Sequence, residues 1–297
     1  MIKKFTPFII LAILAAEPVF AQDSDTTYWK RSFKTGISLN QAAFSSNWSA
    51  GGINSIGLNT MLNFRADYRR DRHSWDNQVD FLYGFVNNDG QGYRKTNDRL
   101  FLDTKYGYAL SSKWDMFTSL TFLSQFARGY RFENDADGVE QAIRISNFMT
   151  PGFLTLAWGF EYKPADFFRI RFSPFAPRLT FAFDEVALAN VPTRYGVDPG
   201  KNVRTEWLAA QIMADFNKNL TETINLKWRY IMFAGYDNFS FETIDHRLDA
   251  MLTAKLVKYL DVSLNFIMLY DKDQADGIQY NQSLGIGFVY SIQNFQE

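Results

Sequence analysis

Alternation of apolar and polar residues with a period of two dominates this sequence from about residue 30 onward. Successive side chains of a β-strand point to opposite faces, so this period predicts strands. Segment 56–68 places Ile, Leu, Thr, Leu, Phe, Ala and Tyr on one face and Gly, Asn, Met, Asn, Arg and Asp on the other. Segments 224–234 and 280–290 alternate similarly. These runs exceed the roughly five or six residues of an average strand, which favours strands that cross a membrane.

The same rule, applied to the whole chain, predicts an all-β fold, a transmembrane antiparallel up-and-down β-barrel of about 12 strands. Tight connections alternate with longer ones, as periplasmic turns alternate with outer loops in such barrels. The apolar parity changes between Pro174 and Pro177, which predicts a bulge or strand break. The expected strands are 33–44, 54–69, 74–87, 98–110, 114–128, 148–163, 167–183, 203–217, 221–235, 242–257, 260–271 and 279–291. The longer connections are 44–53, 88–97, 129–147, 184–202, 236–241 and 272–278.

Residues 1–21 have the pattern of a secretory signal peptide, in which Lys3 and Lys4 precede an apolar run that ends with small residues at Ala21. The chain has no cysteine, which excludes disulfides and thiolate metal sites. No linker divides residues 22–297, so we expect one barrel domain. The 31 basic and 32 acidic residues are spread evenly, so no nucleic-acid partner is expected. Together these features predict the outer membrane of a Gram-negative cell.

Aromatic residues beside both the short and the long connections predict two girdles, one at each membrane interface. The charged face must then line the interior, because a basic side chain facing lipid costs about 2–4 kcal/mol at mid-bilayer. The alternative, a soluble pair of β-sandwiches, needs strands about half as long. The lumen-lining residues predicted on this basis are Arg65, Asp67, Asp76, Asp80, Asp103, Lys105, Glu161, Arg169, Arg171, Lys227, Arg229, Arg247, Asp249 and Lys255.

The two histidines do not indicate an enzyme. An outer-membrane phospholipase of twelve strands uses a His and a Ser on its outer wall, so it is the precedent to test. Here His73 lies in a short turn, and His246 begins a strand on the lipid-facing parity without a clear Ser on the adjacent strands. We therefore predict no catalytic residue and no cofactor.

One acidic loop partly matches a calcium-binding loop. Glu133, Asp135, Asp137 and Gly138 lie at offsets one, three, five and six, but Arg144 stands where the final bidentate Glu should be. We interpret the segment as a solvated acidic loop, predict no metal site, and leave calcium open.

Two other loops have alternative interpretations. The segment Trp48–Asn54 is either a surface-binding patch or a loop folded into the barrel mouth. The stretch Asp198–Gly200 reads as a turn, because Pro presets one backbone angle and Gly tolerates a positive one.

Three stretches, 47–55, 94–98 and 195–204, have distinctive amino-acid sequences. Through them the chain resembles the uncharacterised "domain of unknown function 3078" family of Gram-negative envelope proteins, from about Trp29 to about Asp273. The resemblance implies an envelope barrel. It assigns no role to any residue.

The leading hypothesis is a porin-like, non-enzymatic channel or transport-type barrel for a small polar solute. The alternative is a structural or surface-binding barrel that acts through its long extracellular loops. Expected partners are outer-membrane lipid, lipopolysaccharide and the barrel assembly machinery. The pattern leaves open whether the lumen is open or plugged, and which oligomeric state forms.

Overall fold

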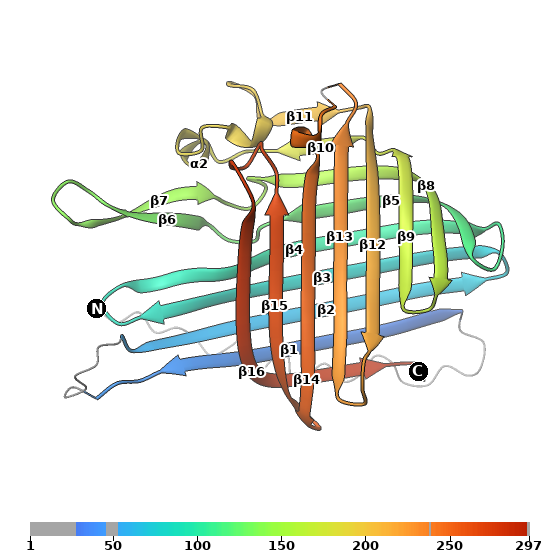
Figure 1. Cartoon of the computed structure of the whole chain (residues 1–297), viewed down its shortest axis with the longest axis horizontal. Coiled ribbons are helices and arrows are strands. Elements are labelled where there is room, and N and C mark those ends of the chain that lie inside the picture. The colour runs from blue at the N-terminus through green and yellow to red at the C-terminus, as the bar shows by residue number, and fades with distance from the viewer. Residues whose placement is uncertain (1–27, 46–52, 238, 296–297) are drawn as a thin grey trace.

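The computed structural model, which describes residues 28–45, 53–237 and 239–295, contains a closed antiparallel β-barrel (Figure 1). Twelve strands follow one another round the wall in the order β1-β2-β3-β4-β5-β8-β9-β12-β13-β14-β15-β16. β16 pairs with β1, so the ring is complete. The predicted fold class and strand number are confirmed. The wall strands are β1 (Trp29–Ala42), β2 (Ser55–Arg70), β3 (His73–Asn88), β4 (Gly92–Ala109), β5 (Trp114–Ser124), β8 (Gly152–Ala165), β9 (Phe168–Phe175), β12 (Ala209–Asn219), β13 (Ile224–Gly235), β14 (Asp245–Val257), β15 (Leu260–Tyr270) and β16 (Gln279–Gln293).

The predicted strand break at the prolines is confirmed. β9 ends at Phe175, and the chain resumes as β10 (Arg178–Phe181), which pairs with the first residues of β8 and with β11 (Val203–Glu206). The expected strand 203–217 is likewise divided, into β11 and β12. β10 and β11 therefore leave the ring and lie at its upper end (Figure 1).

One expected loop is mostly strand. The sequence predicts a long connection over 88–97, but β3 and β4 extend through it and pair as far as Asn88 and Gly92. Gly90 and Gly92 have φ of 76° and 69°, a conformation that glycine adopts without a steric penalty. These two glycines allow a tight turn where the sequence suggested a loop.

Two further expected loops contain regular structure. β6 (Gly129–Asn134) and β7 (Glu140–Ser146) form a hairpin that projects from the wall (Figure 1). The next long connection contains α2 (Glu185–Ala189) and η1 (Arg194–Gly196), and η2 (Phe241–Thr243) precedes β14. Buried apolar side chains join the α2 segment to Ile145 of β7: Ala182, Leu188, Val191, Tyr195 and Val197.

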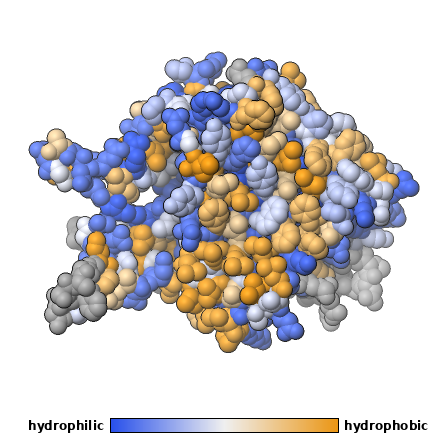
Figure 2. Space-filling view, viewed as in Figure 1, coloured by the Kyte–Doolittle hydropathy of each residue, from blue (hydrophilic) through white to orange (hydrophobic). Residues whose placement is uncertain are grey.

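The outer face of the barrel is apolar and carries aromatic pairs at both ends. Near the tight turns, the ring centroids of Trp114 and Tyr162 lie 4.7 Å apart. At the opposite end, Tyr230 stacks against His246 at 6.1 Å. Tyr130, which borders the predicted connection 129–147, lies on the hairpin strand β6 and not on the barrel wall. Figure 2 shows hydrophobic side chains gathered over the wall formed by the last strands.

Some predictions fall outside the described residues: the signal peptide 1–21 and most of the segment Trp48–Asn54. Among the helices that the structure describes, none has the length and apolarity to cross a bilayer.

Gly159 in β8 lies where the backbone of β9 passes very close. A Cβ there would collide with the backbone carbonyl oxygen of Phe172 in β9. We expect Gly159→Ala to separate the two strands, at a cost of roughly 1–3 kcal/mol or more, because backbone cannot move aside as a flexible side chain can. In the matched variant Gly235→Ala, the nearest atom is a Glu206 side-chain oxygen at 3.4 Å.

The measurement is the fraction of heat-modifiable protein on unboiled gels. Gly159→Ala should reduce this fraction and Gly235→Ala should not. Equal fractions for both variants would show that the β8–β9 contact does not limit closure.

Candidate functional site in the barrel interior

The two ends of the barrel differ in the connections that they carry. The short-turn end carries the tight β2–β3, β4–β5, β8–β9, β12–β13 and β14–β15 turns. The loop end carries β10, β11, the β6–β7 hairpin and the α2 segment. Between these ends, the interior is packed with buried side chains on one side and hollow on the other.

A buried ion-pair cluster fills the packed side. It consists of Asp76, Asp103, Lys105, Glu161 and Arg171, whose side chains are each at most 8% exposed. Arg171 donates to both Asp103 oxygens, at 2.8 and 3.2 Å. Lys105 Nζ lies 3.0 Å from Asp76 and also pairs with Glu161. Lys105 contacts Asp76 and Glu161, and Arg171 contacts Asp103 and Glu161, so each of these buried charges has a partner, as buried charges require.

A second group of charges, the cross-barrel bridge, joins opposite walls. It consists of Asp80, Arg99, Arg229 and Asp249. Arg99 of β4 lies 2.9 Å from Asp249 of β14, and Arg229 of β13 lies 3.8 Å from Asp80 of β3. Five wall strands separate β4 from β14 in either direction round the ring, and the same holds for β3 and β13. The bridge therefore spans the full width of the barrel.

The vestibule is a cavity of about 560 Å³ on the short-turn side of this bridge. All four bridge residues line it, together with Arg65, Asp67, Lys227 and Lys255. Lys255 and other residues at its rim are exposed at the short-turn end, including Lys30, Asn219 and Lys258. The vestibule thus has a solvent-accessible mouth at the short-turn end and a wall of charged side chains at its inner limit.

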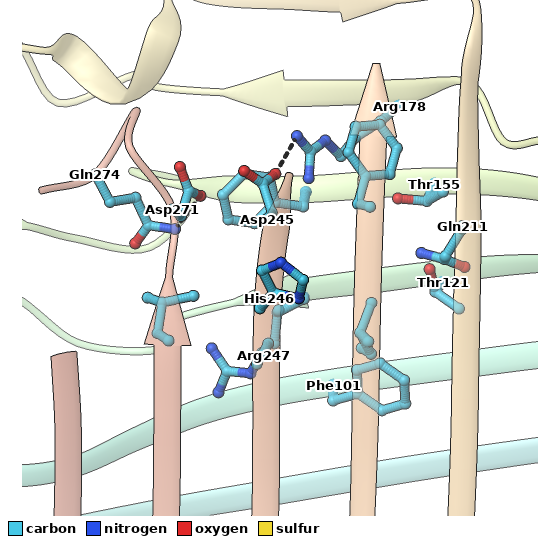
Figure 3. A pocket seen from close by; sticks show the side chains of 15 residues that line it. Phe101, Thr121, Thr155, Arg178, Gln211, Asp245, His246, Arg247, Asp271 and Gln274 are labelled. Atoms are coloured by element: carbon cyan, nitrogen blue, oxygen red, sulfur yellow. Dashed lines mark hydrogen bonds and ion pairs between the residues drawn. The ribbon is translucent and has the colours of Figure 1, made fainter. Parts of the chain in front are cut away.

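A smaller loop-end pocket of about 70 Å³ lies beyond the bridge (Figure 3). Arg178 of β10 donates to Asp245 of β14 at 2.7 Å and so ties β10 across this pocket. Asp271, just past β15, accepts a hydrogen bond from Gln274 at 2.6 Å. Burial raises the pKa of Asp271 above its ordinary value, although that hydrogen bond and the charge of Arg178 act in the opposite direction.

The structure places the fourteen predicted interior residues in three groups. Five form the buried cluster, with Arg169 beside it, 3.4 Å from Asp215. Three belong to the bridge, and Arg247 pairs with one of them, Asp249, at 2.9 Å. The remaining four line the vestibule: Arg65, Asp67, Lys227 and Lys255. That a solute meets these side chains stays a prediction.

Sequence reasoning missed several interior charges that matter, among them Lys34, Arg99 and Asp215. Arg99 has the same parity as Asp103 and Lys105 in β4, so the alternation itself could have identified it. Asp215 of β12 accepts from Arg229 at 2.6 Å and shares the parity of buried Gln211 and Met213.

The residues considered for catalysis and metal binding make other contacts. His73 Nδ1 lies 2.5 Å from the Tyr106 hydroxyl, and His246 Nδ1 lies 2.6 Å from the Tyr230 hydroxyl. Asp135 accepts hydrogen bonds from the backbone of Asp137 and Val139 within its own turn. Among the described residues, no group of three His, Cys, Asp or Glu side chains could hold a metal ion.

Residues 39–130 match the family model described as "Protein of unknown function (DUF3078)". The resemblance to this family is confirmed over that segment. The match includes two of the three stretches that suggested it, and 195–204 lies outside. A search of curated proteins found no significant match.

Solved structures similar to this chain are membrane barrels of low identity. The translocator domain of autotransporter NalP from Neisseria meningitidis has 8% identity, TM-score 0.35, and 90% of each chain covered. An outer membrane channel from Pseudomonas putida F1 has 9% identity and TM-score 0.39, with 92% of this chain and 98% of that chain covered. OmpT, an outer membrane protein of Vibrio cholerae, has 9% identity and TM-score 0.30, with 92% and 100% covered. The fold assignment rests on the closed sheet itself, because scores this low carry no further meaning.

The buried cluster should dominate the stability of the barrel. Arg171→Met leaves Asp103 without its bidentate partner in a dry interior, which should lower the free energy of unfolding by about 3–5 kcal/mol. The matched variant Arg131→Met removes an arginine that is 49% exposed and paired with Glu133, and should cost about 0–1 kcal/mol.

Both variants are compared with the unchanged protein by urea unfolding in detergent micelles, followed by tryptophan fluorescence. Similar midpoints for the two variants would rule out a dominant role for the cluster.

Proposed function

We propose that this protein is an outer-membrane barrel of the channel or transport type, non-enzymatic, through which a small polar solute crosses. Its N-terminal 21 residues deliver it to the envelope of a Gram-negative cell, and the barrel assembly machinery inserts it among lipid and lipopolysaccharide. The apolar outer face, with aromatic pairs at both ends, supports the location, because such a surface suits lipid and its two interfaces.

One observation carries the transport proposal: the hollow side of the interior ends at side chains rather than at backbone. The vestibule reaches from the short-turn end to the cross-barrel bridge, where Arg99 and Asp249 meet at 2.9 Å. A side chain can change rotamer far faster than a wall strand can move. A solute would therefore pass where the bridge opens, and the bridge sets the conductance.

Arg99→Ala tests this directly. It removes one of the two arginine side chains of the bridge, while Asp249 keeps Arg247 and Asp80 keeps Arg229 as partners. We expect single-channel conductance in planar bilayers to rise about twofold or more, because the constriction widens without leaving a carboxylate unpaired. The matched variant Arg72→Ala removes an exposed arginine from a tight turn and should leave conductance unchanged.

An Arg99→Ala barrel that is folded, as judged by heat-modifiable migration, and still shows no conductance would overturn the channel proposal. If the conductance of Arg99→Ala is no higher than that of Arg72→Ala, the bridge does not set the conductance.

The β6–β7 hairpin favours a second candidate function, a surface-binding barrel. It projects beyond the wall, yet Arg94 of β4 anchors it by donating to Glu140 at 2.6 and 2.8 Å and by stacking on the Phe132 ring at 3.9 Å. A projecting element held at its base can present residues to a partner. Removal of residues 130–145 should abolish this function while leaving the barrel folded, and unaltered surface binding would eliminate it.

A further inference from the structure

The charged side chains that line the vestibule are unequal in number. Eight are basic: Lys30, Lys34, Arg65, Arg99, Lys227, Arg229, Lys255 and Lys258. Four are acidic: Asp67, Asp80, Asp249 and Asp261. The whole chain has 31 basic and 32 acidic residues, so the excess of positive charge is a property of this cavity.

Three of the four carboxylates are already committed to arginines. Asp249 accepts two hydrogen bonds from Arg247, both at 2.9 Å, and a further contact from Arg99. Asp80 lies between Arg229 and Lys227, at 3.8 and 3.6 Å. Asp67 lies 3.6 Å from Arg65, in the same strand. These acids therefore offer little attraction to a solute cation.

Lys30 and Lys258, at the rim, lie over the rings of Phe295 and Tyr259 at 5.7 and 5.1 Å, which leaves two other vestibule lysines available to a ligand. Within the described part of the chain, no carboxylate lies within 4.0 Å of the Lys34 or Lys255 amine. Lys34 stands opposite Asn63 and Ser291 in the neighbouring strands. Lys255 stands opposite Asp261, the fourth acid, which does not reach ion-pair distance. Both amines thus carry charge that the protein leaves without a close partner.

Neutral donors accompany these amines in the same cavity. Ser32, Ser291 and Asn265 line the vestibule with hydroxyl and amide groups. Ammonium groups with hydroxyl and amide donors are the side chains that bind oxyanions, by charge-assisted hydrogen bonds. A cavity with low-dielectric walls and one prevailing sign of charge also concentrates ions of the opposite sign.

We propose that the vestibule binds small diffusible oxyanions, of the class of inorganic phosphate, and that Lys34 and Lys255 are the main binding residues. The cavity lies inside the closed wall, which favours a free ion over a lipid headgroup. The proposal names oxyanions as the solute class of the proposed transport function. As a statement about transport it rests on that function, but oxyanion binding does not require that the barrel conduct.

The test is calorimetric titration of inorganic phosphate into the full-length folded barrel in an uncharged detergent at low ionic strength, where screening is weak. The double variant Lys34→Gln/Lys255→Gln should weaken phosphate binding about tenfold, because two positive charges that line the cavity are lost. The matched double variant Lys201→Gln/Lys272→Gln changes net charge equally at the loop end and should bind as the unchanged protein does.

A conservative double variant, Lys34→Arg/Lys255→Arg, keeps the charges and should retain binding within about threefold. Loss of binding in the Gln pair with retention in the Arg pair supports the proposal. Equal binding in the Gln pair and its control overturns it, as does absence of phosphate binding to the unchanged protein.

Reversal potentials in a salt gradient separate this proposal from the channel proposal. Phosphate binding without conductance in either the unchanged protein or Arg99→Ala leaves the anion site standing and removes the channel. Conductance that favours cations leaves the channel standing and overturns an oxyanion as its solute. Conductance that favours anions, reduced by Lys34→Gln/Lys255→Gln, supports both.

Discussion

Closure of the sheet at the β8–β9 seam is the constraint on which the rest of this structure depends. An open sheet of this length would leave a row of unpaired backbone donors and acceptors at each edge, which lipid cannot satisfy. The seam is irregular, because β8 pairs with β10 over its first residues and with β9 over its later ones. At Gly159 the backbone of β9 passes so close to that of β8 that a Cβ would collide with the Phe172 carbonyl oxygen.

Once the sheet is closed, the charged face becomes an enclosed interior, and its charges must find partners within it. On the side of β3, β4, β8 and β9 they form a packed ion-pair cluster, in which Lys105 and Arg171 are almost inaccessible. On the side of β1 and β13–β16 they leave a cavity. The need for partners for enclosed charge thus yields a packed half and a hollow half, with the Arg99–Asp249 contact at their boundary.

The alternation of side chains along the sequence predicts much of this architecture. The strands, their number and the inward side of Asp103, Lys105 and Glu161 follow from a local rule, because each residue's face depends only on its neighbours along the strand. The break after Phe175 followed from the change of parity around two prolines. The tight β3–β4 turn could not be predicted in this way, because Gly90 and Gly92 are equally compatible with a long loop. The helix α2 is too short to show a period.

By itself, the sequence determined that this chain forms a barrel of about twelve strands and which face of each strand is charged. Only the tertiary structure decided which charges meet. Arg99 and Asp249 lie 150 residues apart in the numbering and on opposite walls, and their contact depends on closure, strand order and stagger together. Alternation specifies a direction for each side chain, whereas a binding cavity depends on distances between strands that only the closed ring establishes.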